Sequence, residues 1–179
     1  MLRFVRIKEH HLEMILRWRT QPEVTKYMYS DIEFDLKKQK EWHEKVKKDP
    51  NERYWIIEFN NQFIGLVSLN QIDWGAKCCS WAFYIGEPKA RLFGTMIFPY
   101  VYRYIFEELQ FSRLIGEVME GNENIRKIHR IYGSREIEVI KNRIYKYGKY
   151  HDVYVMEMLD SDWFKIKEKY IQFKAYFEE

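Results

Sequence analysis

The sequence has only two cysteines, no long apolar run and no zinc-like grouping of ligands, and each shortage excludes a class of protein. Cys78 and Cys79 are neighbours in a predicted strand. Successive side chains of a strand point to opposite faces, so we expect no disulfide. No Cys/His grouping has the spacing of a zinc site, and we expect no bound metal. No apolar run approaches the ~18 residues of a membrane-spanning helix, and the first residues lack the apolar core of a signal peptide. The expected location is therefore the cytoplasm, with no membrane partner.

Net charge is also low, at +3 from 30 basic and 27 acidic residues. Because Lys and Arg are interleaved with Asp and Glu, no basic stripe indicates a nucleic-acid partner. The charge still permits a modest attraction to a phosphorylated small molecule. The 179 residues suit one domain with one core, and the aromatic content of 18% suits a pocket for flat rings.

Hydrophobic periodicity predicts an α+β chain in which strands and helices surround one crossover. Short apolar or aromatic runs predict strands at Leu2 to Ile7, Tyr54 to Phe59, Phe63 to Leu69, Cys78 to Ile85, Leu114 to Met119, Ile137 to Tyr147 and Tyr150 to Leu159. Helices are predicted from Leu12 to before Pro22, from the N-cap Asp35 to before Pro50, from Thr95 to Leu109, and from Gly121 to Gly133. Asn60-Asn61 and Gly148 predict the turns of two hairpins.

The last residues carry a helical pattern of their own. Apolar side chains recur at three/four spacing between charged residues, at Trp163, Ile166, Tyr170, Phe173 and Phe177. This predicts an amphipathic C-terminal helix over residues 160–179, packed on a domain formed by residues 1–159. A homodimer contact through this helix is the second possibility.

The centre of the chain is the stretch from Pro88 to Thr95, between a predicted strand and a predicted helix. A loop at a helix start presents unpaired backbone N–H groups, and the helix dipole adds partial positive charge. Such a loop suits an anion, for example a pyrophosphate.

Arg91-Leu92-Phe93-Gly94-Thr95-Met96 resembles the R/Q-x-x-G-x-G/A loop of the Gcn5-related N-acetyltransferases (GNAT). In that superfamily the loop amides hold the pyrophosphate of acetyl-CoA, and a mixed central sheet is flanked by helices. The resemblance implies acetyl-CoA as co-substrate, with its amide-bearing arm paired like a strand along Phe83 to Gly86. The coenzyme-binding residues it implies are Phe83, Ile85, Arg91, Leu92, Gly94, Thr95 and Asn122. The chain departs from the family pattern at Leu92, Met96, Ile125 and Ser134.

A second set of motifs resembles one branch of this superfamily. Leu16 to Val24, with its Trp-Arg and proline, is followed by Tyr27-Met28-Tyr29, and further matches continue to Trp163. That branch acetylates the 4-amino group of UDP-4-amino-4,6-dideoxy-N-acetyl-β-L-altrosamine in pseudaminic acid biosynthesis, which supplies surface or flagellar glycans. The resemblance implies a UDP-amino-sugar as the acceptor.

Substrate chemistry then indicates which residues meet that acceptor. Two phosphates need a cation with fork geometry, which Arg19 offers, and a flat uracil needs an aromatic face. The residues expected to bind the acceptor are Arg19, Met28, Tyr29, Trp42, Trp81 and Tyr84. Trp42 and Trp81 fit a core position equally well.

An acetyl transfer to an amine needs a base, since a protonated amine cannot attack a thioester. We expect Glu117 to be this base, buried beside aromatic side chains, because Glu120 lies at the strand end and faces the other side. The departing thiolate needs a proton donor. At the position where the family often has Tyr this chain has His129, with Tyr132 as a nearby substitute; an ordinary helix-surface histidine is the equal alternative for His129.

Two alternatives stay open at this stage. Trp-Arg-x-x-Pro also begins ribosomal-protein-type acetyltransferases, which modify protein N-termini. The departures in the coenzyme loop would also fit a binding protein that keeps the fold and has lost the transfer activity.

Overall fold

The structure, a computed structural model, describes residues 2–179, so the first residue of the predicted domain lies outside it. A mixed sheet forms the centre, with strand order β6-β7-β5-β4-β3-β2-β1-β8. The strands are β1 (Leu2–Arg6), β2 (Arg53–Phe59), β3 (Gln62–Asp73), β4 (Cys78–Ile85), β5 (Arg113–Met119), β6 (Arg135–Lys146), β7 (Lys149–Leu159) and β8 (Tyr176–Phe177). The α+β class and the mixed sheet flanked by helices are confirmed.

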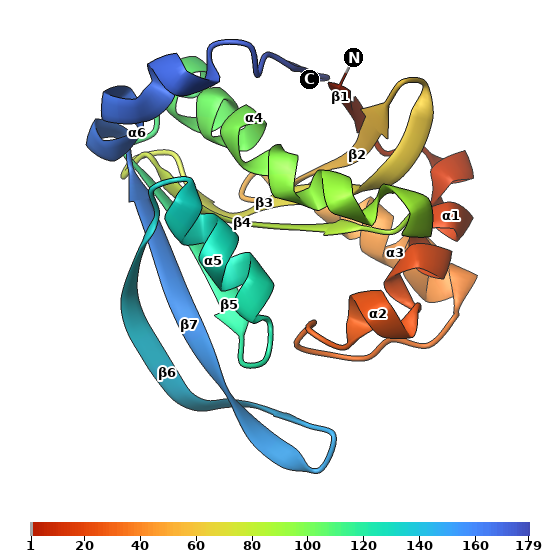
Figure 1. Cartoon of the computed structure of the whole chain (residues 1–179). Helices are drawn as coiled ribbons and strands as arrows, with labels where there is room; N and C mark the ends of the chain where they lie inside the picture. Colours follow the sequence, from red (N-terminus) through yellow and green to blue (C-terminus); the bar gives the residue numbers. More distant parts are fainter. Residues whose placement is uncertain (1) are drawn as a thin grey trace.

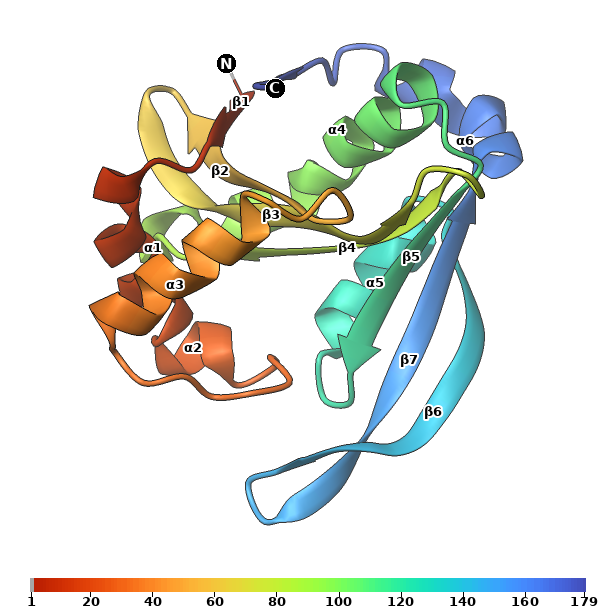
Figure 2. The ribbon, with the colours of Figure 1, turned by 180° about the vertical axis from the view of Figure 1, so that it is seen from behind.

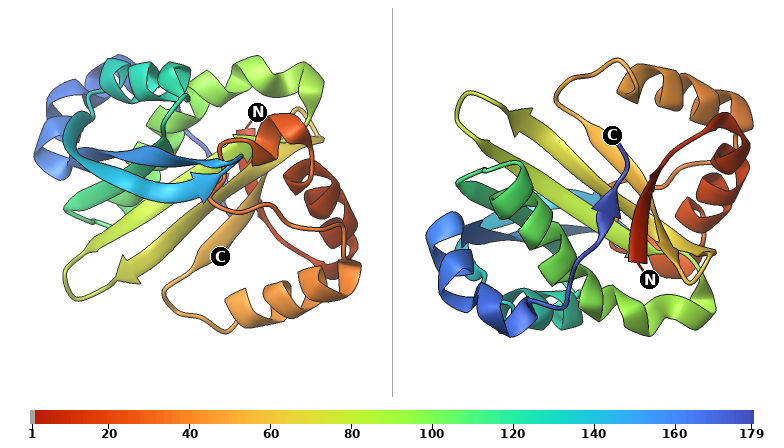
Figure 3. Two further views of the ribbon diagram at one scale, coloured as in Figure 1. Left: turned by 90° about the horizontal axis from the view of Figure 1, so that it is seen from below. Right: turned by 90° about the horizontal axis from the view of Figure 1, so that it is seen from above.

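The helices divide between the two faces of the sheet (Figure 1). They are α1 (Leu12–Arg19), α2 (Pro22–Thr25), α3 (Leu36–Val46), α4 (Ile97–Arg103), α5 (Glu123–Ile131) and α6 (Asp160–Ile166), with 3₁₀ turns η1 (Glu9–His11), η2 (Pro88–Met96) and η4 (Lys167–Tyr170) and a π-helical turn η3 (Tyr104–Glu108). Seen along the sheet, α4, α5 and α6 lie on one face, and α1 and α3 lie on the other (Figure 3).

Each face has its own apolar core. The larger core joins α4 and η3 to the sheet and includes Phe98, Tyr102 and Trp163, each at most 1% exposed. The smaller core packs Ile15 and Trp18 of α1 on β2 and β3. Alternation along β4 assigns its side chains to these faces: Cys79 and Trp81 belong to the larger core, whereas Tyr84 packs against the smaller one.

The strands β4 and β5 run parallel but stay together over only four paired positions, from Cys78 opposite Arg113 to Trp81 opposite Gly116. Beyond these pairs β4 continues along β3 and β5 continues along β7. Figure 2 shows the two strands moving apart. The divergence leaves one backbone edge of each strand free of sheet pairing, and it is the feature that positions the site described below.

The prediction of one C-terminal helix over residues 160–179 is wrong. The helix α6 ends at Ile166, η4 follows, and the chain then extends to form β8, which pairs in parallel with β1. The apolar side chains that suggested a helix are buried through three different elements. Phe177 stacks on Phe4 and on Tyr104, with ring centroids 3.9 Å apart in both pairs.

Two further boundaries differ from the expectation. Pro22 does follow the end of α1, but it also begins α2, because the fixed φ of proline suits the first position of a helix. The helix expected from Thr95 to Leu109 is regular only over α4 and then widens into η3. Both hairpins were predicted at the right place, with Asn60, Asn61 and Gly148 at positive φ.

Candidate active site

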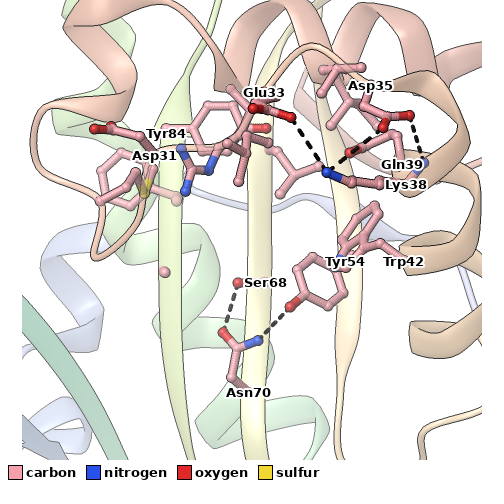
Figure 4. A pocket seen from close by; sticks show the side chains of 18 residues that line it. Asp31, Glu33, Asp35, Lys38, Gln39, Trp42, Tyr54, Ser68, Asn70 and Tyr84 are labelled. Atoms are coloured by element: carbon pink, nitrogen blue, oxygen red, sulfur yellow. Dashed lines mark hydrogen bonds and ion pairs between the residues drawn. The ribbon is translucent and has the colours of Figure 1, made fainter.

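A cavity of about 750 Å³ lies on the α1 and α3 face of the sheet (Figure 4). Its floor is formed by β2, β3 and β4, and its walls by α1, α3 and the chain that joins α2 to α3. The lining residues are Ile15, Leu16, Arg19, Met28, Asp31, Ile32, Glu33, Asp35, Lys38, Gln39, Trp42, Tyr54, Leu66, Ser68, Asn70, Ala82, Phe83 and Tyr84. The cavity therefore brings together four of the predicted substrate residues, Arg19, Met28, Trp42 and Tyr84.

Arg19, at the end of α1, holds its guanidinium in the cavity wall. Its Nη1 donates to Thr25 Oγ1 at 3.0 Å and its Nη2 donates to the Ser30 carbonyl at 2.8 Å. Burial lowers the pKa of the Arg19 guanidinium from its usual value, while the Tyr84 hydroxyl and the Asp31 carboxylate act in the opposite sense. Two donors of the fork are used by the protein, which leaves about three of its five N–H groups for a ligand.

Charged groups at the rim of the cavity occur in pairs of opposite sign. Lys38 lies 3.4 Å from Glu33 and 3.9 Å from Asp35. Lys146 lies 2.9 Å from Asp31, and this hydrogen bond lowers the pKa of the Asp31 carboxyl. Arg19 and Lys38 line the cavity and Lys146 lies buried behind Asp31, so three cations balance the three carboxylates and no large excess of either sign remains.

A polar network on the cavity floor was missed at the sequence level. The Asn70 side chain links the Ser68 hydroxyl, at 2.8 Å, to the Tyr54 hydroxyl, at 3.0 Å. Glu52 accepts from both Asn70 and Tyr54, at 2.6 and 2.7 Å. Burial and the bond to Glu52 raise the pKa of the Tyr54 hydroxyl, so it stays a donor. Ser68 and Asn70 are two apart on one strand, and this spacing was the available signal that they share a face.

The predicted aromatic faces divide between the two sides of the sheet. Trp42 lines the cavity and meets the Tyr54 ring edge to face, with centroids 5.1 Å apart. Trp81 is 6% exposed and packs in the opposite core against Phe83 and Phe98. Its assignment as a substrate-binding residue is therefore wrong, because three positions separate it from Tyr84 and alternation turns the two side chains to opposite faces.

The divergence of β4 from β5 fits the amide-bearing arm of acetyl-CoA. Residues Ala82 to Ile85 pair with β3 on one side only, so the N–H and C=O groups on the other side face the opening. A linear amide can add to such an edge like a strand. Phe83 lies where this edge meets the cavity.

The stretch expected to be an open phosphate-binding loop is instead the 3₁₀ helix η2. A 3₁₀ helix bonds each N–H to the carbonyl three residues earlier, so most of its amides are already used. Arg91 contacts Glu23 at 3.5 Å, and Leu92 is 85% exposed. Gly94 is buried against β4, where an added Cβ would lie 3.3 Å from Ile85. The hydroxyl of Thr95 donates to the Leu92 carbonyl at 2.9 Å.

Glu117 lies on β5 just after the last pair with β4. The side chain is exposed rather than buried, and the Tyr29 hydroxyl donates a short hydrogen bond to its carboxylate. Partial burial and this bond raise the pKa of Tyr29 from its usual value. The expected burial of Glu117 beside aromatic rings is therefore wrong, and the side chain that bonds to it is Tyr29, which was predicted to bind substrate.

His129 does not have the environment expected of a protonated donor. It is 4% exposed, and burial lowers its pKa to about 3, so it is neutral near pH 7. Its Nδ1 has no hydrogen-bond partner among the described residues. The ring packs on Gly116, where an added Cβ would lie 2.6 Å from His129 Cε1, so only glycine fits opposite it.

The other two predicted residues of this region lie on or beside α5. Tyr132 stacks on Phe98 with ring centroids 5.3 Å apart, and burial raises the pKa of its hydroxyl, which therefore remains protonated. Asn122 is the N-cap residue of α5 and makes no side-chain capping bond. Within residues 2–179, no cluster of three His, Cys, Asp or Glu side chains is arranged to hold a metal ion, and no helix is long and apolar enough to cross a membrane.

Comparison with known families gives a match over most of the chain. The model of a family described as an acetyltransferase (GNAT) domain matches residues 1–135. Among curated proteins, the acetyltransferase PseH of Campylobacter jejuni subsp. jejuni serotype O:23/36 (strain 81-176) is 25% identical over 129 residues, which are 70% of this chain and 78% of that protein.

Solved structures agree on the fold. The spermidine N-acetyltransferase from Vibrio cholerae, in complex with CoA and spermine, superposes with a TM-score of 0.84 at 20% identity, over 91% of this chain and 98% of that one. Mutant forms of the spermidine/spermine N-acetyltransferase SpeG from the same organism give a TM-score of 0.76 at 19% identity, over 92% and 98%. At these identities the similarity shows a shared fold and does not indicate which substrate this chain uses.

Proposed function

The chain belongs to the GNAT acetyltransferase family and is an acetyl-CoA-dependent N-acetyltransferase, and from this premise we propose that its acceptor is the 4-amino group of a UDP-linked amino-dideoxy sugar. The observation that carries the proposal is the cavity itself, which combines the half-buried guanidinium of Arg19 with aromatic walls and meets the free edge of β4. The similarity to PseH supports the same acceptor class.

Size and chemistry of the cavity suit a nucleotide sugar. Its volume of about 750 Å³ lies within the range of ligand pockets, roughly 300 to 1,000 Å³. The free donors of Arg19 offer a two-pronged contact to phosphate oxygens, which a lysine cannot make. Trp42 offers a flat face for the base, and the network around Asn70 offers donors and acceptors to sugar or uracil oxygens.

Glu117 is the residue we assign to proton removal. The amine nitrogen forms a bond to the acetyl carbonyl carbon, the carbon–sulfur bond breaks, and the proton of the amine passes to the Glu117 carboxylate directly or through water. Free N–H groups on the β4 edge would polarise the carbonyl. For the thiolate we retain Tyr132 as the proposed proton donor, because its hydroxyl is protonated whereas His129 is neutral.

Acetyl-CoA would be held partly by side chains. The strand edge at Phe83 to Ile85 fits the amide-bearing arm, and Gly94 and Thr95 lie in the turn after it. Since the amides of η2 are engaged within the turn, we assign the phosphate contacts to the exposed cations Lys89 and Arg91.

A polyamine acceptor is the second candidate, favoured by the three carboxylates Asp31, Glu33 and Asp35 at the cavity rim. Each of them is already paired with a lysine. A polyamine would have to displace these cations, so we rank it below the nucleotide sugar. A peptide N-terminus, the alternative left open by the sequence, is the third arm of the test.

The test is release of free CoA thiol by the purified protein with acetyl-CoA and each acceptor in turn: the UDP-4-amino-dideoxy sugar, spermidine, and a short peptide with a free N-terminus. We expect turnover of the UDP sugar at least about a hundredfold above the other two, as expected for a site built to hydrogen-bond its substrate. Preferred turnover of spermidine or of the peptide would overturn the proposal. A role in surface or flagellar glycan synthesis, a cytoplasmic location and a homodimer stay predictions.

A further inference from the structure

Residues 25–31, the segment between α2 and the cavity rim, lie across the open end of the divergence between β4 and β5. Three side chains tie this segment to the far half of the sheet: the Tyr27 hydroxyl donates to the Gly121 carbonyl at 3.1 Å, Tyr29 donates to Glu117, and Lys146 reaches the segment from β6. Seen from below, the end of the β6 and β7 hairpin lies beside this part of the chain (Figure 3). The segment therefore forms part of the cavity wall, through Met28 and Asp31, and also contacts β5 at Glu117.

Lys146 makes the strongest of these ties. Its ammonium group donates to the carbonyls of Thr25 at 2.6 Å and Met28 at 2.9 Å, and it lies 2.9 Å from the Asp31 carboxylate. An ammonium has three N–H donors, so all of them are used within seven residues of the segment. The Lys146 side chain is only 5% exposed. A buried charge with every donor satisfied fixes its partners in place.

Tyr29 links this fixed segment to Glu117 through a hydrogen bond. The Glu117 side chain is exposed and would otherwise sample several rotamers, whereas the bond from Tyr29 selects one. Two charged residues of β6 also lie near this bond. Arg143 is close enough to act on the Tyr29 hydroxyl, and Glu138 lies in the same cross-strand row as Glu117, with Val155 of β7 between them. Tyr29 is the neighbour that bonds to the carboxylate.

We propose that Tyr29 is a positioning residue for Glu117, and that Lys146 acts through it by holding residues 25–31 across the opening. This inference rests on the proposed function, because it takes Glu117 as the base. It replaces the earlier interpretation of Tyr29 as a face on which the substrate stacks.

A double-mutant cycle tests the role of Tyr29, with whichever acceptor of the panel is turned over. Tyr29→Phe should lower kcat on the order of tenfold with an unchanged KM for the acceptor, as expected for a misplaced base. In the Glu117→Gln background the same change should lower kcat less than about twofold, because the residue it positions is gone. Equal losses in both backgrounds, or a loss in KM alone, would overturn the inference. If Glu117→Gln itself keeps normal turnover, the assignment of the base fails instead.

Lys146→Met belongs in the same cycle and should behave like Tyr29→Phe. Lys149→Met is the matched control, since Lys149 lies opposite Lys146 in the hairpin register and is exposed. Tyr150→Phe, at a residue 60% exposed on the same hairpin, is the control for the loss of a hydroxyl. Neither control should change kcat.

Amide hydrogen exchange tests the tie independently of turnover. Lys146→Met should make the amides of residues 25–31 exchange roughly tenfold faster, because bonds to a charged group are lost, and Tyr29→Phe should have a smaller effect in the same direction. Lys149→Met should leave exchange there unchanged. Unchanged exchange in both Lys146→Met and Tyr29→Phe would show that the segment is not held by these residues and would overturn the inference, whatever the acceptor proves to be.

Discussion

Arg19 shows how a single side chain can serve the wall of a cavity and its ligand together. Because Thr25 and Ser30 already hold two of its donors, the guanidinium is oriented before any substrate arrives. We predict that Arg19→Lys raises the KM for the UDP sugar by about tenfold or more, since a lysine cannot hold the wall and offer two parallel bonds to phosphate. The KM for acetyl-CoA should not change. Steady-state kinetics with each substrate varied in turn provide the measurement.

Arg17→Lys is the control for Arg19→Lys. Arg17 lies two residues earlier on α1, is exposed and pairs with Glu13 one turn away. Its replacement should leave both KM values as they are. If Arg19→Lys raises both KM values equally, Arg19 supports folding rather than the ligand.

His129 gives a prediction for stability against pH. Its pKa is lowered to about 3 by burial, whereas in the unfolded chain it titrates near 6.5. Below pH ~6.5 the unfolded state therefore binds one more proton, and the free energy of unfolding falls by up to about 1.4 kcal/mol per pH unit as the pH drops toward 4. Urea denaturation from pH 7 to 4 measures this slope.

The comparison with His129→Phe isolates that slope. The variant removes the titrating group and keeps an aromatic ring. Between pH 7 and 4 the unfolding free energy of the wild type should therefore fall more steeply than that of the variant. A difference that is constant with pH would show that folding does not lower the pKa of His129.

At the same scale, the sequence predicted some site residues and misplaced others for one physical reason. Arg19 and Trp42 were recognised by their chemistry, and both line the cavity. Trp81 was chosen by the same chemistry, yet its position on the strand turns it to the other face. Tyr54 and Asn70 were given no role in the site and were missed, although the polar residues Ser68 and Asn70 at alternate positions of β3 marked this face. Residue type indicates what a side chain can bind, whereas strand alternation decides which face it reaches.

Among the elements, β8 contributes more to stability than its two residues suggest. Phe177 is 5% exposed and lies between the rings of Phe4 and Tyr104, with Trp55 edge-on at 5.3 Å. We predict that Phe177→Ala lowers the free energy of unfolding by about 3 kcal/mol, through lost burial and the cavity left behind. Chemical denaturation measures it. Tyr176→Ala, at a neighbour 61% exposed, should cost less than about 0.5 kcal/mol.

The C-terminal segment explains why β8 was not predicted. Trp163 and Ile166 on α6, Tyr170 on η4 and Phe177 on β8 all pack against the larger core, as a helical pattern would require. A three/four spacing reports only that a face is buried, and a helix followed by a turn and a short strand can bury the same residues. The last residues form a strand rather than a helix because they pair with the edge of β1, which lies far away in the sequence.

For the whole molecule, ligand binding should be visible as a gain in thermal stability. A ligand at 100 times its dissociation constant adds about 2.7 kcal/mol. At this chain length that corresponds to a rise in Tm of roughly 5 to 10 °C. We predict such shifts with acetyl-CoA and with UDP, measured separately by a fluorescence melt. A shift with UDP and none with millimolar acetyl-CoA would favour a protein that binds the nucleotide but has lost its coenzyme.

The overall architecture was predictable because most of it depends on local signals. Asn60-Asn61 and Gly148 placed two hairpins, and the glycine-containing stretch before α4 placed the crossover. The open end between β4 and β5 had no local signal, since it depends on where Trp81 stops pairing with Gly116. Only the assembled sheet shows it.

The short pairing between β4 and β5 divides the sheet into two plates, that is, two groups of strands that are joined at one corner only. On one side lie β1, β2, β3, β4 and β8, and on the other β5, β6 and β7, with four paired positions between them. Bending within either plate would break many ladder bonds, whereas rotation about the corner breaks few, so the molecule has one soft direction. A rotation about this corner would widen the opening between β4 and β5 and would stretch the hydrogen bonds of Lys146 to residues 25–31 in the same movement, so these bonds oppose it.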